Sequence, residues 1–214
     1  MKHSPALVGG ALLVLVPTVF FVALAALVVD DPKPGLDSRL LMFLYDHVDD
    51  TPLDRAFGLL LGPGLWLGFA AVVAWIAVLA LRGRPTPALF LASALLAVFV
   101  AERILKLVFE RAAINDAGAD SFPSGSAAIS LGAVAAAVLL AGRGHRAWLA
   151  LGGTALVALY GVSIVASGWH YPSDVAAGWS LALALVSALW LALRRPTLVA
   201  DAARGRSGEI SRFR

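Results

Sequence analysis

Six long apolar segments are the feature that most limits how this chain can fold. They lie at roughly 6–29, 53–81, 87–109, 124–141, 147–166 and 172–194. A helix needs about 20 residues to cross a hydrocarbon core about 30 Å thick, and each segment is close to that length or longer. The sequence therefore predicts an all-α, polytopic membrane protein, built as a bundle of six transmembrane helices.

Composition agrees with this class and excludes several others. Hydrophobic residues make up 60% of the chain and charged residues 14%, which does not describe a soluble domain. The absence of cysteine excludes disulfides and thiolate metal sites, and none of the four histidines has metal-ligand spacing. We therefore expect no metal and no cofactor. The net charge of +3 comes mainly from arginines in short loops and the tail, so it indicates topology rather than a nucleic-acid partner.

The first apolar segment resembles a signal peptide because Lys2 precedes it. Its run is longer than the usual hydrophobic region, however, and no clear small-x-small cleavage site precedes Asp30 and Asp31. We expect it to remain as a transmembrane helix. Residues 1–194 then form one membrane-embedded domain, and residues 195–214 form a basic cytoplasmic tail.

A shorter helix is predicted between the first two spans, over residues 36–48. Apolar side chains recur there at helical spacing, with charged residues between them: Leu40, Leu41, Leu44, Tyr45 and Val48. This pattern is typical of a helix that lies in the membrane interface.

The arginines orient the bundle. If six helices alternate, one side receives Lys2, the tail and two basic turns at 82–84 and 143–146. The other side receives the acidic loop at 30–50 and the segments that precede the fourth and sixth helices. The positive-inside rule makes the first side cytoplasmic. We expect a bacterial inner (plasma) membrane protein whose polar outer segments face the extracytoplasmic side.

A histidine and a carboxylate stand four residues apart where the sixth segment begins. An aspartate one helical turn from an imidazole can accept its N–H, fix its tautomer and leave the other nitrogen free to attack. His170 and Asp174 are therefore a candidate catalytic pair. The alternative is a capped helix, with Pro172 in its first turn, Ser173 or Asp174 serving the free amides, and His170 packed at an interface.

Two more polar groups reach the same outer side. Lys106 ends the third segment and Arg111 follows it, and such fixed cations suit a phosphate. Alternatively, Glu102 pairs with Lys106, and the basic side chains extend to the lipid headgroups at the membrane surface. Ser124 and Gly125 open the fourth segment, where a helix start can bind an anion or Ser124 can simply cap the helix.

A rhomboid-type serine protease would have a glycine where Phe122 stands, so we do not take Ser124 as a nucleophile.

Residues 106–174 resemble the type 2 phosphatidic acid phosphatase family of membrane lipid phosphatases. The family pattern is Lys-x6-Arg-Pro, then Pro-Ser-Gly-His, then Ser-Arg-x5-His-x3-Asp. The matching positions, in the family's order and spacing, are Lys106, Pro123, Ser124, Gly125, Ser163, His170 and Asp174.

Each of the three motifs departs from the pattern. Ala113 and Ile114 stand where the first motif has arginine and proline, and Arg111 is a candidate replacement. Ser126 takes the place of the second-motif histidine, which is the family's general acid. Ile164 replaces the third-motif arginine.

The resemblance implies that His170 attacks phosphorus to form a phosphohistidine and that Asp174 orients it. It also implies that no metal takes part. The residues implied for binding the phosphate are Lys106, Arg111, Ser124, Gly125, Ser126 and Ser163. The lipid tail would enter sideways from the bilayer, and membrane lipids are the surrounding partners.

The departure at Ser126 bears on the substrate. Losing a general acid costs about 10²–10⁴ in rate, which is severe for a monoester with an alkoxide leaving group. It is milder for a lipid pyrophosphate, whose leaving phosphate has a second pKa of about 6. If the chain is active, Ser126 therefore favours a polyprenyl pyrophosphate or a similar activated substrate.

Two functions follow from these residues. The first is a lipid phosphate or pyrophosphate phosphatase at the outer leaflet, favoured by the retained pair of His170 and Asp174. The alternative is a catalytically degenerate member that binds or helps translocate phospholipids, favoured by Ala113, Ser126 and Ile164. The sequence leaves a homo-oligomer open.

Overall fold

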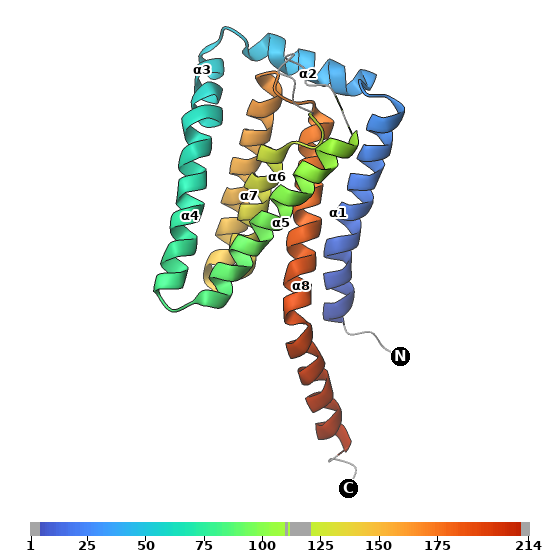
Figure 1. Ribbon diagram of the computed structural model, residues 1–214, viewed down its shortest axis with the longest axis vertical. Helices are drawn as coiled ribbons and strands as arrows, with labels where there is room; N and C mark the ends of the chain where they lie inside the picture. The colour runs from blue at the N-terminus through green and yellow to red at the C-terminus, as the bar shows by residue number, and fades with distance from the viewer. Residues whose placement is uncertain (1–4, 110, 112–120, 211–214) are drawn as a thin grey trace.

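The computed structural model describes residues 5–109, 111 and 121–210, and every regular element in them is helical. The elements are α1 (Pro5–Asp30), α2 (Gly35–Val48), α3 (Pro52–Leu59), η1 (Leu60–Gly64), α4 (Leu65–Leu81), α5 (Pro85–Phe109), α6 (Gly125–Leu140), α7 (Arg143–Ala166) and α8 (Pro172–Ile210). The long helices run alternately up and down, and α2 lies across one end of the bundle (Figure 1). The all-α prediction is confirmed.

Five stretches are long and apolar enough to cross a membrane. They are Gly9–Asp30, Pro52–Leu81, Pro85–Phe109, Arg143–Ala166 and Pro172–Leu193. Large apolar side chains cover their outer surfaces, as at Leu13 and Trp66, so the chain is an integral membrane protein. The fourth predicted span corresponds to α6, which has only 16 residues. A sixth crossing and an interfacial position for α2 therefore stay predictions.

The second predicted span is one continuous stretch but not one uninterrupted α-helix. It consists of α3, the π-helical turn η1 and α4, with Pro63 inside the turn. Proline has no N–H and its ring crowds the preceding turn, so the regular hydrogen-bond ladder cannot pass through it. A π turn accommodates such a break while the helix continues.

Helix α8 holds the bundle together, because it packs against α1, α5 and α6. It approaches α6 most closely at Gly178, where a Cβ atom would lie 2.4 Å from the backbone oxygen of Ser124. Gly161 of α7 similarly makes room for the Trp179 ring. α8 stays helical beyond Leu193, as far as Ile210 (Figure 1).

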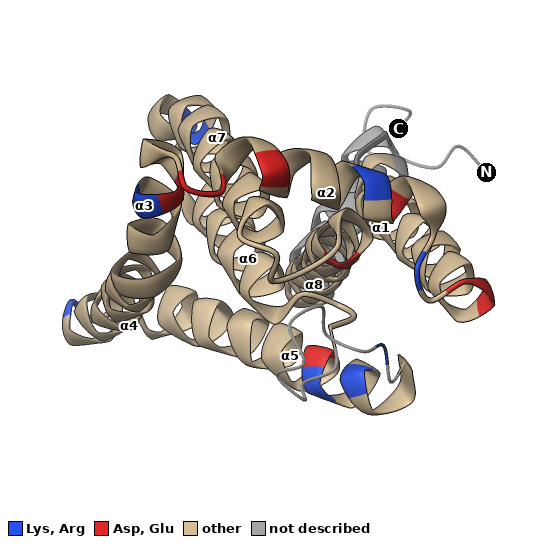
Figure 2. Ribbon diagram, turned by 90° about the horizontal axis from the view of Figure 1, so that it is seen from above, with Lys and Arg blue, Asp and Glu red and all other residues tan. Residues whose placement is uncertain are grey.

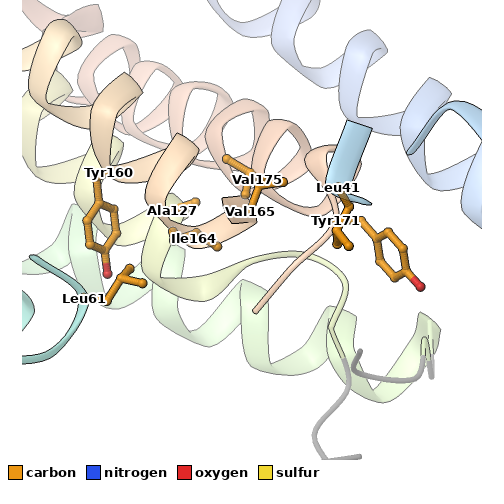
Figure 3. Packing of buried hydrophobic residues seen from close by; sticks show 8 residues of the cluster. All are labelled: Leu41, Leu61, Ala127, Tyr160, Ile164, Val165, Tyr171 and Val175. Atoms are coloured by element: carbon orange, nitrogen blue, oxygen red, sulfur yellow. The ribbon is translucent and has the colours of Figure 1, made fainter. Parts of the chain in front are cut away.

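A buried apolar cluster joins five elements near the α2 end of the bundle (Figure 3). Its members are Leu41 of α2, Leu61 of η1, Ala127 of α6, Tyr160, Ile164 and Val165 of α7, and Tyr171 and Val175 around the start of α8. This cluster fixes the start of α8 against α2 and α7.

Candidate active site

His170 is positioned by the way α7 ends. The helix closes in a Schellman motif, in which the amide of Trp169 donates to the Ile164 carbonyl and the amide of Gly168 to that of Val165. Gly168 has a φ of 69°, in the left-handed region that costs glycine nothing. The chain therefore turns out of α7 at Gly168, and His170 follows two residues later.

The carboxylate of Asp174 serves both the helix and the histidine. One oxygen, Oδ2, accepts the Tyr171 amide at 3.0 Å, as a third-position acid does when it reaches back to cap a helix. The same oxygen lies 3.5 Å from Nδ1 of His170. Asp174 is fully buried, whereas the His170 side chain is 16% exposed. The capped helix and a histidine that faces the same carboxylate are therefore compatible, although the contact with Nδ1 lies at an ion-pair distance and is not a hydrogen bond.

The start of α6 lies directly against Asp174. The Ser124 amide donates to the backbone carbonyl of Asp174 at 3.0 Å, across 50 positions of sequence. Phe122 anchors this segment from the other side, since its buried ring packs against Phe109 and Phe21 with centroids 5.1 and 5.9 Å apart. A helix N-terminus, where anions bind readily, is thus fixed against Asp174, the residue that faces the candidate nucleophile.

Glu102 connects Lys106 to the same helix start. Its Oε1 lies 3.5 Å from Nζ of Lys106, and its Oε2 lies 3.1 Å from Nε of Arg103. A Cβ atom on Gly125 would lie 2.7 Å from Oε1. The predicted pairing of Glu102 with Lys106 is therefore present, and it occurs against Gly125. Charged residues of α2, α5 and α8 gather at this end of the bundle (Figure 2).

Arg111 is buried among protein groups. Its Nε donates to the Pro32 carbonyl at 2.8 Å, its Nη1 to Asp174 and to Ser173 at 2.8 Å, and its Nη2 to Asp37 at 2.9 Å. Its guanidinium also stacks 4.1 Å from the centroid of the Tyr171 ring. All three nitrogens thus have protein partners. A role for Arg111 as a direct phosphate ligand stays a prediction.

Tyr171 stays neutral beside this arginine. Burial raises the pKa of its phenol above the ordinary value; Arg111 opposes that rise, and Asp174 and Asp37 add to it. A neutral phenol keeps its ring available for the stacking contact with Arg111.

Sequence reasoning did not single out Asp37 as a site residue. This α2 residue is buried, accepts the Ser173 amide at 2.9 Å through Oδ1, and pairs with Arg111 through Oδ2. A signal was present, because Asp37 shares a helical face with Leu41, Leu44 and Val48. A carboxylate on the buried face of an amphipathic helix needs a partner.

Comparisons with known proteins agree with this geometry. The family model described as the PAP2 superfamily matches residues 88–197, just over half of the chain. The chain belongs to the PAP2 superfamily. The resemblance inferred from the motifs is thereby confirmed. Among curated proteins, no match was found.

A solved PAP2 structure has the same fold. It is the crystal structure described as that of the first transmembrane PAP2-type phosphatidylglycerolphosphate phosphatase from Bacillus subtilis, with a TM-score of 0.71. The identity is 19%, over 95% of this chain and 100% of the other. The likeness therefore extends beyond the PAP2 family match to the N-terminal helices.

The remaining PAP2 motif positions differ in their surroundings. Ile164, in the arginine position, is fully buried in the apolar cluster. Ser163 is buried too, and its hydroxyl donates to the Tyr160 carbonyl at 2.7 Å. Ser126 is half-buried in the first turn of α6. Ala113 lies outside the described residues.

Proposed function

We propose that this PAP2 protein is a membrane phosphatase that hydrolyses a lipid phosphate or polyprenyl pyrophosphate through a phosphohistidine. The observation that supports this most is the junction of α6 and α8. There, Asp174 approaches His170 through its side chain and binds the Ser124 amide through its backbone. A nucleophile, the residue that orients it and an anion-binding helix start therefore share one corner of the bundle.

In the proposed reaction, Nε2 of His170 forms a bond to phosphorus while the bond from phosphorus to the leaving oxygen breaks. Nδ1 keeps its proton and faces Asp174. The first amides of α6 and the ammonium of Lys106 stabilise the charge on the phosphoryl oxygens. Water then attacks phosphorus, releases inorganic phosphate and restores His170.

The proposed topology places this corner on the extracytoplasmic side of a bacterial inner membrane. Both termini and the basic turns are cytoplasmic by the positive-inside rule. Helix α2 lies across the same end of the bundle, next to the start of α8 (Figure 1), and this topology would place it in the outer interface. The lipid phosphate then reaches the site from the outer leaflet.

Ser126 supports a preference for pyrophosphates within this proposal. A serine hydroxyl is a poor acid for an alkoxide, whereas a phosphate leaves without a proton. Polyprenyl pyrophosphates provide such a leaving group.

A second candidate function is phospholipid binding or translocation without turnover. Two observations favour it: Ile164 is packed into the apolar cluster, and the nitrogens of Arg111 already bind protein groups. Both reduce the number of cations available to a phosphate.

The test is release of inorganic phosphate by the purified protein from a panel of lipid monophosphates and pyrophosphates, beside His170→Ala. We expect turnover of pyrophosphates that His170→Ala abolishes. Ser126→His should raise monoester hydrolysis by a substantial part of ~10²–10⁴ and pyrophosphate hydrolysis much less. The gain should vanish in the double variant with His170→Ala. Background activity on both substrate classes, in the wild type and in Ser126→His, would favour the binding function.

A further inference from the structure

Asp37 reaches the candidate active site from a helix outside all three PAP2 motifs. It lies in α2, 136 positions before Ser173 and 74 before Arg111, and contacts both. Its side chain is 6% exposed. The contacts tie α2 to the first turn of α8, where Asp174 stands.

Arg111 bridges two carboxylates. Nη2 binds Asp37 at 2.9 Å and Nη1 binds Asp174, while the arginine side chain is 1% exposed. Such charge-assisted bonds from one rigid guanidinium hold the two carboxylates in fixed positions around it. The position of Asp174 relative to His170 therefore depends on Arg111, and that of Arg111 depends on Asp37.

Asp37 gives this cluster a net negative charge. Without it, Arg111 would cancel the charge of Asp174, the carboxylate that faces His170. With it, two carboxylates and one guanidinium carry a net charge of −1. The His170 ring becomes cationic when Nε2 bonds to phosphorus, because Nδ1 keeps its proton. The net negative charge of the cluster thus stabilises the cationic ring of the phosphohistidine more than it stabilises the neutral imidazole of the resting state.

We propose that Asp37 is a positioning residue for the reaction at His170, acting through Arg111 and Asp174. This inference rests on the proposed phosphatase function. A purely structural Asp37 would fix α2 to α8 and affect stability alone. A positioning Asp37 affects formation of the bond between His170 and phosphorus more than it affects binding of phosphate.

The test variant is Asp37→Asn, which keeps the side-chain shape and removes the charge. Asp46→Asn is the matched control, because it makes the same change at an exposed position of α2. By Coulomb's law, a unit charge about 8–12 Å from a reacting group, at an effective dielectric of about 20, changes its rate by roughly 10- to 30-fold. We expect kcat for pyrophosphate hydrolysis to fall by about that factor in Asp37→Asn, with KM within about threefold. Asp46→Asn should match the wild type.

A second measurement does not need turnover. Vanadate forms a bond to an attacking nitrogen and mimics the five-coordinate phosphoryl group, whereas inorganic phosphate binds without that bond. We expect Asp37→Asn to weaken vanadate binding about 10- to 30-fold and phosphate binding less than threefold. Asp37→Glu, which keeps the charge, should recover part of the vanadate affinity.

The outcomes separate the two proposals. Turnover that His170→Ala fails to abolish contradicts the proposed phosphatase mechanism, whatever Asp37→Asn does. Equal losses of vanadate and phosphate affinity, or no loss of either, overturn the role of Asp37 alone. If Asp37→Asn does not fold, Arg111→Lys replaces it, because one ammonium cannot bridge both carboxylates as the guanidinium does. The same selective loss of vanadate affinity is then expected, and its absence overturns the inference.

Discussion

Gly178 sets the distance between the two halves of the candidate active site. It lies where α8 approaches α6, and a Cβ atom there would be 2.4 Å from the Ser124 backbone oxygen and 3.2 Å from the Ala128 amide nitrogen. Neither atom belongs to a side chain that can rotate away. The Gly178→Ala variant must therefore move one helix relative to the other.

The size of that movement follows from ordinary contact distances. Separating the new Cβ from the Ser124 oxygen to 3.4 Å, where ordinary van der Waals contact begins, takes 1.0 Å. Ser124 also donates its amide to the Asp174 carbonyl at 3.0 Å, so this shift stretches the bond that joins the helix start to the candidate catalytic pair. A misplacement of about 1 Å can cost about 10² in rate, and overpacking costs about 1–3 kcal/mol of stability.

The assay combines phosphate release from a lipid pyrophosphate with thermal unfolding in detergent. Gly178→Ala should lower kcat/KM about 100-fold and lower Tm by several degrees, leaving most of the protein folded at the assay temperature. Gly152→Ala is the control, because nothing lies within 4 Å of a Cβ at that exposed α7 position. It should leave both quantities near wild type. A Gly178→Ala protein with wild-type kcat/KM would refute the reasoning, as would a loss no larger than its unfolded fraction.

Two further predictions concern the site and the topology. Gly125→Ala places a Cβ 2.7 Å from Oε1 of Glu102, a side chain that can move. We expect this substitution to displace Glu102 from Lys106 and to weaken inhibition by inorganic phosphate about tenfold. Unchanged inhibition would contradict the proposed link between Gly125, Glu102 and Lys106. Helix α2 lies at one end of the bundle and α7 begins at the other (Figure 1). Cysteines replacing His47 of α2 and His145 in the first turn of α7 should therefore differ in labelling by an impermeant thiol reagent, with His47→Cys labelled from outside. Equal labelling from outside would defeat the proposed orientation.

Most helix positions could be predicted, because the length of an apolar run can be read directly from a local stretch of sequence. The predicted short helix at 36–48 corresponds to α2, and the predicted third span at 87–109 ends with α5 at Phe109. The π turn was missed although Pro63 signalled it, because a single proline is tolerated in a membrane helix and the apolar run continues past it. The extent of α8 to Ile210 was also not anticipated, since its last residues lack the apolar character used to define a span.

The candidate site was predictable in its motif residues but not in its charge network. His170 and Asp174 are one helical turn apart, and local spacing predicts their approach. Arg111 was expected to bind phosphate, because sequence alone shows a cation near a motif and not its partners. The pairing with Asp37 spans 74 positions and depends on how α2 lies across the bundle. The apolar periodicity of α2 predicts which face is buried, but it does not predict which charged residue from a distant part of the chain pairs with Asp37.

If α6 is the sixth crossing, its shortness bears on where the proposed reaction takes place in the bilayer. Its 16 residues rise about 24 Å, some 6 Å less than a typical hydrocarbon core of about 30 Å. If the shortfall lies at the N-terminus of α6, the positive end of its dipole lies below the level of the headgroups. A lipid phosphate that docks there must either descend from its own leaflet or meet a bilayer thinned around the protein, and mismatch costs fractions of a kcal/mol per Å. Under the proposed function, the thickness of the host membrane would then be part of substrate recognition, and a lipid with a small headgroup would descend at lower cost than one with a large hydrated headgroup.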